Sequence, residues 1–101
     1  FVMPTVPEIS IEKLKENLSN KAITVLDIRD VSDYEAGHIA DAISITNAIL
    51  PTFIEQADKT KRYAICCYHG NSSQTAVLYL QEIGFKDVAS VTGGYAAWAS
   101  Q

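Results

Sequence analysis

The chemistry-bearing residues of this chain gather around two adjacent cysteines, Cys66 and Cys67, which are its only thiols. Both lie in residues 63–68, the longest uninterrupted apolar run. Neighbouring cysteines cannot cross-link distant parts of a fold, as the spaced cysteines of small secreted proteins do. The pair therefore indicates free thiols and a reducing, cytoplasmic location, and it directs attention to cysteine chemistry.

Residues 67–72 read Cys-Tyr-His-Gly-Asn-Ser and lead from a predicted buried strand into a predicted helix. Over so few residues the backbone must bend around a small volume, and Gly70 and Asn71 tolerate the left-handed conformations that such a bend needs. Lowering a cysteine pKa from ~8.5 to ~6.5 requires about 2.7 kcal/mol, whereas a helix terminus supplies roughly 0.3–1 kcal/mol. Amide hydrogen bonds to a charged sulfur, worth about 1.5–3 kcal/mol each, would supply the rest.

The loop is therefore predicted to form an anion site built on the sulfur of Cys67, with amide donors that follow it in sequence. The predicted members of this loop are Tyr68, His69, Gly70, Asn71 and Ser72. Cys66 should point to the opposite face of the same strand, because side chains alternate along a strand. We expect Cys66 to be a core residue.

Helices and strands are predicted to alternate along the chain. Ser10 is the expected N-cap of the first helix, Ser32 and Glu35 form an expected capping box, and Ser72 or Ser73 should cap the helix that ends at Gly84. The expected helices are 11–20, a short one after Ser32, 47–56, one that starts at Ser72 or Ser73, and 95–100; the expected strands are 22–28, 42–45, 63–67 and 88–91.

This alternation predicts an α/β fold in which one parallel sheet lies between helices. Ligands of such sheets bind beyond the carboxyl ends of the strands, which again selects the segment that starts at Cys67. At 101 residues the chain has room for a single domain, residues 1–101. Residues 1–6 are expected to be a loosely attached N-terminal segment or a remnant of expression.

Composition excludes several classes of protein. Eight basic and twelve acidic residues give a net charge of −4, with no basic cluster beyond residues 59–62, so a nucleic-acid partner is not expected. No apolar run approaches the ~18–20 residues of a membrane span. The two histidines and two cysteines lack the spaced pairs of a zinc site, so no metal is expected.

Four ordered motifs carry a resemblance. Residues 67–73, Asp27-Ile28-Arg29, residues 34–39 and residues 93–98 together resemble the rhodanese (thiosulfate sulfurtransferase) family over nearly the whole chain. The loop Cys-Tyr-His-Gly-Asn-Ser is similar to that of its single-domain GlpE-type members.

The resemblance implies a five-stranded parallel sheet flanked by helices on both faces. It also implies a ping-pong reaction without a cofactor, in which Cys67 takes the outer sulfur of thiosulfate as a persulfide. Cyanide or a thiol such as thioredoxin would then accept this sulfur. The amides of residues 68–72 would stabilise the thiolate and the persulfide.

Alternatives remain open at this level. Family members that prefer thiosulfate often carry basic residues in the loop, where this chain has Tyr68 and His69, so a relay of persulfide between proteins is a second interpretation. A non-catalytic rhodanese-like binding module is a third. A phosphatase of the Cys-x5-Arg type is disfavoured, because the residue six positions after Cys67 is Ser73 and not an arginine.

Other polar and aromatic residues are expected to have structural roles. Asp27 and Arg29 share one face at a strand end and should hold neighbouring loops. His38 should be a structural loop residue, and Tyr95 should pack with Trp98. His69 is either a contact for the donor or an exposed side chain without a partner.

Overall fold

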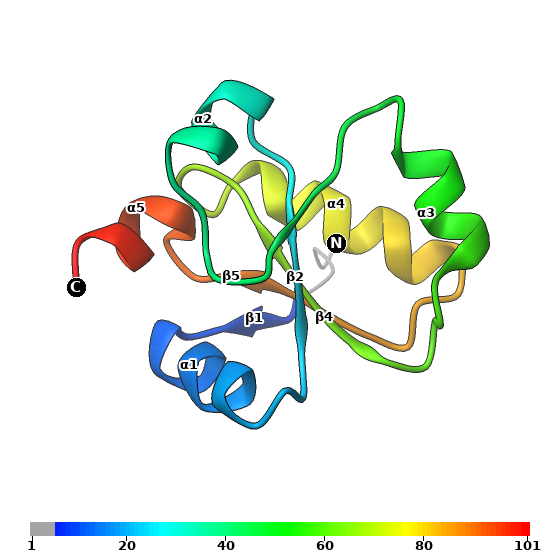
Figure 1. The fold of residues 1–101 in the computed structure, drawn as a ribbon. Helices are drawn as coiled ribbons and strands as arrows, with labels where there is room; N and C mark the ends of the chain where they lie inside the picture. The colour runs from blue at the N-terminus through cyan, green and yellow to red at the C-terminus, as the bar shows by residue number, and fades with distance from the viewer. Residues whose placement is uncertain (1–5) are drawn as a thin grey trace, which may run out of the picture.

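In the computed structural model, which describes residues 6–101, five parallel strands form one sheet with the order β1-β5-β4-β2-β3. The strands are β1 (Glu8–Ile9), β2 (Thr24–Asp27), β3 (Ile43–Ser44), β4 (Arg62–Cys66) and β5 (Asp87–Val91). The helices are α1 (Ile11–Ser19), α2 (Val31–Ala36), α3 (Leu50–Gln56), α4 (Ser72–Glu82) and α5 (Gly94–Ala99). Figure 1 shows the sheet between α1 and α5 on one side and α3 and α4 on the other. The predicted parallel five-stranded α/β fold is confirmed.

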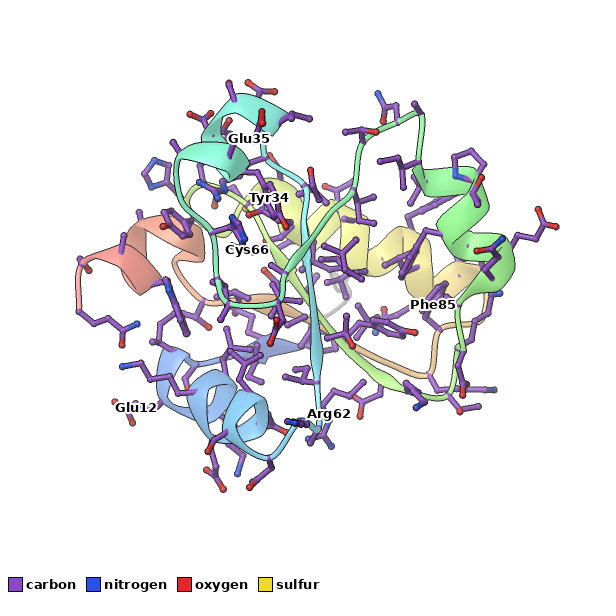
Figure 2. All side chains as sticks on the ribbon, viewed as in Figure 1. Glu12, Tyr34, Glu35, Arg62, Cys66 and Phe85 are labelled. Atoms are coloured by element: carbon purple, nitrogen blue, oxygen red, sulfur yellow. The ribbon has the colours of Figure 1, made fainter. Side chains whose placement is uncertain are left out.

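Helices cover both faces of the sheet, and the sheet separates the interior into two cores. The first, here called the α1–α5 core, contains Leu14, Val25, Cys66 and Val91, with Trp98 packed against it. The second, here called the α3–α4 core, lies on the other face of the sheet, and the strand residues that enter it alternate with those of the first core. Its buried members are Leu26, Ile45, Tyr63, Ile65, Val77, Leu80, Phe85 and Val88. Figure 2 shows the separation, with Cys66 on the α2 and α5 side and Phe85 beside α3 and α4.

The two central strands are apolar on both faces because each face is covered by a helix layer. In β4, Tyr63 and Ile65 enter the α3–α4 core, whereas Ala64 and Cys66 enter the α1–α5 core. This strict alternation places Cys67, the first residue after β4, at the carboxyl edge of the sheet with its side chain directed toward α4. The strand predicted over 63–67 is thus one residue earlier at both ends.

Several predicted helix starts were wrong. The capping box at Ser32 is absent, because α2 already begins at Val31 and the carbonyl of Asp30 accepts its first hydrogen bonds. Helix α3 begins at Leu50 and not at residue 47, and Pro51 lies in its first turn, where a missing N–H group costs little.

The start of α4 also differs from the prediction. Its N-cap is Asn71, and Ser72 and Ser73 are its first two helical residues. Asn71 has a right-handed backbone with φ of −93°, so of the two residues that tolerate a left-handed backbone only Gly70, with φ of +89°, adopts it. The side chains of both serines are thereby free of any capping role.

The N-terminal part of the chain adds a strand that the sequence did not indicate. β1 has only two residues and pairs with the edge of β5 through Glu8 and Ile9. The predicted loose segment, residues 1–6, lies outside the described residues except for Val6, which packs against the α3–α4 core. Among residues 6–101, no helix is long and apolar enough to cross a membrane.

Candidate functional site

The sulfur of Cys67 lies inside a ring of hydrogen-bond donors. The amide of Gly70 donates to Sγ over 3.1 Å and the amide of Ser73 over 3.4 Å. The hydroxyl Oγ of Ser73 lies 3.2 Å from the same sulfur. Cys67 is 3% exposed, so these protein atoms, and not bulk water, solvate it.

Two opposing effects act on the thiol of Cys67. Burial favours the neutral form and would raise its pKa. Hydrogen bonds from the Ser73 side chain and from the amides of Ser73, Gly70 and His69 favour the thiolate, and together they outweigh burial, so the pKa is lowered. No lysine or arginine is needed for this, because neutral amide and hydroxyl groups act as the donors.

The structure brings part of the predicted loop to the sulfur. The Gly70 amide contacts it directly and the His69 amide lowers its pKa, whereas the side chains of Tyr68 and Ser72 are exposed. Within residues 6–101, no hydrogen bond joins Sγ to Tyr68, Asn71 or Ser72.

Ser73 is the residue that the sequence analysis missed as a ligand of the sulfur. From the sequence, Ser73 is expected only as a possible helix cap and as the position where a phosphatase of the Cys-x5-Arg type has arginine. Its place six residues after the cysteine, in the first turn of α4, was the available signal, since the amides of a first turn have no partner within the helix.

A second helix start holds the loop from the other side. In the first turn of α5, the amide of Tyr95 donates to the carbonyl of Cys67 over 2.8 Å, and that of Ala96 donates to the carbonyl of Tyr68 over 3.0 Å. Gly94 permits this approach: a Cβ there would stand 2.5 Å from the Cys67 oxygen, and its φ is +62°. With the carbonyls of Cys67 and Tyr68 hydrogen-bonded to α5, the first two peptides of the loop have a fixed orientation.

Arg29 lies under the loop but its charge is already neutralised. Its Nε and Nη2 atoms donate to both carboxylate oxygens of Asp27 over 2.8–3.1 Å, and Nη2 also donates to the carbonyl of Gly37 over 2.7 Å. The guanidinium stacks on the ring of Tyr95 at 3.9 Å, and hydrogen bonding to Asp27 raises its pKa. The prediction that Asp27 and Arg29 hold neighbouring loops is confirmed.

Tyr68 ties the loop to α2. Its hydroxyl donates to a carboxylate oxygen of Asp33 and accepts the amide of Asp30 over 3.2 Å. The hydrogen bond to Asp33 raises the pKa of the phenol. The side chain is 41% exposed, so it lies on the outer surface of the loop.

The remaining candidates have structural places. Cys66 is fully buried in the α1–α5 core, as predicted, and burial raises its pKa to about 12. His38 stacks on Tyr34, with ring centroids 3.9 Å apart, while His69 is exposed. Figure 2 shows Cys66 close to Tyr34. Among residues 6–101, no three His, Cys, Asp or Glu side chains are grouped to hold a metal ion.

Comparisons with known proteins agree with this geometry. The family model for the rhodanese-like domain matches residues 10–101. The chain is 41% identical over 96 residues to thiosulfate sulfurtransferase GlpE of Shewanella oneidensis, covering 95% of each protein. It is 42% identical over 90 residues to the enzyme of the same name in Pseudoalteromonas translucida, covering 89% of this chain and 86% of that one.

Among solved structures, a rhodanese-related protein from Thermoplasma volcanium superimposes with a TM-score of 0.81 at 35% identity, covering 93% of this chain and 91% of that one. The chain belongs to the family of rhodanese-like domains.

Proposed function

We propose that this protein is a thiosulfate sulfurtransferase that carries a sulfane sulfur on Cys67. The observation that carries the proposal is the set of donors from Gly70 and Ser73 around a single buried sulfur. Relatives that share 41–42% of its residues are named for this activity. A thiolate at neutral pH is the form of cysteine that attacks sulfur.

The proposed reaction has two balanced steps. The thiolate of Cys67 attacks the outer sulfur of thiosulfate, a new S–S bond forms, and the bond to the sulfonate sulfur breaks, so that sulfite leaves with the electron pair. Cyanide then attacks the outer sulfur of the persulfide, thiocyanate leaves, and the thiolate returns. A thiol acceptor such as thioredoxin would take the place of cyanide in a cell. The persulfide is anionic, so the donors that favour the thiolate also suit the loaded form.

The site suits sulfur better than phosphate. A phosphatase of the Cys-x5-Arg type needs a guanidinium fork to hold phosphate oxygens. The corresponding side chain here is Ser73, which is fully buried against the sulfur itself. With Cys67 only 3% exposed, Sγ can meet the outer sulfur at a vertex of thiosulfate more easily than the central phosphorus of a phosphate, which its oxygens shield.

A thiosulfate sulfurtransferase and a persulfide relay between proteins differ in their physiological sulfur donor. The loop offers no lysine or arginine to a doubly charged donor, and Arg29, whose guanidinium lies 6.0 Å from the Tyr68 ring, is paired with Asp27. This observation favours a persulfide-donating protein as the second candidate. A cytoplasmic location fits two free cysteines and stays a prediction.

Intact mass after incubation with thiosulfate tests the proposal. We expect a gain of one sulfur atom that cyanide removes, that Cys66→Ser retains and that Cys67→Ala lacks. Loading by a persulfide donor but not by thiosulfate would replace the proposal with the relay. Loading by neither would leave a binding module, and turnover of p-nitrophenyl phosphate would favour a phosphatase.

A further inference from the structure

Two buried hydroxyl groups form a row with the reactive sulfur. Ser73 Oγ lies 3.2 Å from Cys67 Sγ and 2.5 Å from Ser90 Oγ. Ser73 belongs to the first turn of α4 and Ser90 to β5, on the strand face that α4 covers. Both serines are fully buried. These two hydroxyl groups lie between a helix and a strand whose other contacts are mainly apolar, so their presence there needs an explanation.

The direction of the hydrogen bonds in this row follows from counting protons. Among residues 6–101, Ser90 Oγ has one hydrogen-bond partner, Ser73 Oγ. If Ser73 donated to Ser90, the proton of Ser90 would be left in the interior without an acceptor, which is costly. If Ser90 donates to Ser73, its proton is paired. The single proton of Ser73 is then left for the sulfur.

The protonation state of the sulfur completes the count. With a thiolate, the row has two protons for two contacts, and every proton meets an acceptor. With a thiol, the row has three protons for the same two contacts, and one of them is left over. The row is therefore satisfied in full only when Cys67 is ionised.

We propose that Ser90 is a positioning residue that directs the hydroxyl proton of Ser73 onto the sulfur of Cys67. By accepting a hydrogen bond from Ser90, the Ser73 hydroxyl also becomes a stronger donor, because linked hydrogen bonds polarise one another. The proposal deepens the proposed function and rests on Cys67 acting as a thiolate. In this proposal β5, which does not contact the sulfur, helps to stabilise the thiolate through Ser90.

The pH dependence of alkylation at Cys67 measures this effect without any sulfur donor. We expect Ser73→Ala to raise the pH midpoint by about one to two units, since a hydrogen bond to a charged group is lost. Ser90→Ala should raise it by about 0.3 to 0.5 units, which corresponds to a weakened Ser73 donor. Peptide mass mapping assigns the alkylated residue.

Ser44→Ala is the matched control. Ser44 lies on β3, separated from β4 by β2, and its hydroxyl is buried without a partner among the described residues. This substitution removes a buried hydroxyl two strands away from β4, so the pH midpoint of alkylation should stay at the wild-type value. A shift in Ser44→Ala equal to that in Ser90→Ala would overturn the proposal, because any lost hydroxyl would then have the same effect.

The double variant decides whether Ser90 acts through Ser73. In the Ser73→Ala background, Ser90→Ala should cause no further shift, because the group that it orients is gone. Equal shifts in both backgrounds, or no shift in the wild-type background, would overturn the proposal. If Ser73→Ala does not fold, the comparison of Ser90→Ala with Ser44→Ala still decides. Failure of thiosulfate loading with these shifts intact would reject the proposed substrate and leave the role of Ser90 standing.

Discussion

Cys66 and Cys67 are neighbours in the chain, yet the two regions of the molecule around them have opposite effects on a thiol. Cys66 lies at the end of β4 in an apolar core, where burial raises its pKa to about 12. Cys67 is also buried, but hydrogen bonds from Ser73 and Gly70 lower its pKa. Burial alone therefore does not decide reactivity. The donors that the surrounding backbone presents decide it.

The two regions also place different demands on the backbone. The core around Cys66 is stabilised by buried apolar surface and needs no particular peptide orientation. The loop around Cys67 needs Gly70 at positive φ and Gly94 in close contact with a carbonyl. Substitutions in the two regions should therefore have different effects on activity and stability.

The two cysteines should respond differently to the same substitution. We expect Cys67→Ser to abolish sulfur loading, since a hydroxyl cannot form a persulfide. Cys66→Ser should retain loading while losing about 1–3 kcal/mol of stability, because a polar group enters an apolar core. Intact mass and urea unfolding measure the two quantities. Loss of loading in a stable Cys66→Ser protein would show that Cys66 takes part in the reaction.

The contact between α5 and the loop should be nearly as sensitive. In Gly94→Ala, the new Cβ would stand 2.5 Å from the carbonyl oxygen of Cys67, so the loop must move. We expect the rate of thiocyanate formation to fall by up to about a hundredfold, as a displacement near 1 Å does in other sites.

Gly84→Ala is the control for Gly94→Ala. It has a comparable backbone strain with φ of +106°, but its Cβ would meet only the end of the Lys59 side chain at 3.6 Å. It should lose stability and keep the rate. An unchanged rate in Gly94→Ala would show that α5 does not hold the loop in its active shape.

The two thiols should affect stability in opposite pH ranges. The raised pKa of Cys66 gives stability that is complete below the ordinary thiol pKa of about 8.5 and is lost as pH rises toward about 12. The lowered pKa of Cys67 gives stability that is present above the ordinary value and is lost as pH falls through the folded-state pKa.

Urea unfolding from pH 7 to 11 checks the alkaline part of this prediction. Cys66→Ala should show a smaller alkaline loss than the wild type. Some loss should remain, because burial also raises the pKa of Tyr63. The same alkaline slope in both proteins would mean that Cys66 ionises as easily in the native state as in the unfolded state.

The smallest effect is expected at His69. Its amide contributes to lowering the pKa of Cys67, but its side chain is exposed and makes no hydrogen bond among the described residues. His69→Ala should change the rate with thiosulfate by less than about twofold, in line with most exposed substitutions. A rise in KM of tenfold or more would instead place the imidazole on the donor.

The sequence predicted the parts of the site that depend on local pattern. The apolar run before Cys67, the glycine at position 70 and the helix that follows defined a strand, a bend and a set of amide donors. Alternation along β4 placed Cys66 in a core. The expectation that Asp27 and Arg29 hold neighbouring loops followed from their shared face at a strand end, whereas their salt bridge is seen only in the structure.

What the sequence did not reveal depends on contacts between distant segments. Ser73 reaches the sulfur, and Ser90 reaches Ser73, only because α4 packs across β5. Serine is common and carries no periodic signal, so neither hydroxyl stood out. β1 was not predicted for a related reason. Its two residues are too few to show alternation, and their pairing with β5 is a tertiary contact.

The place of α5 in the chain has a consequence for biosynthesis. All five strands and the cysteine loop precede α5, yet the amides of Tyr95 and Ala96 fasten the loop carbonyls. We therefore expect the loop around Cys67 to reach its final shape during synthesis only after α5 has emerged and docked.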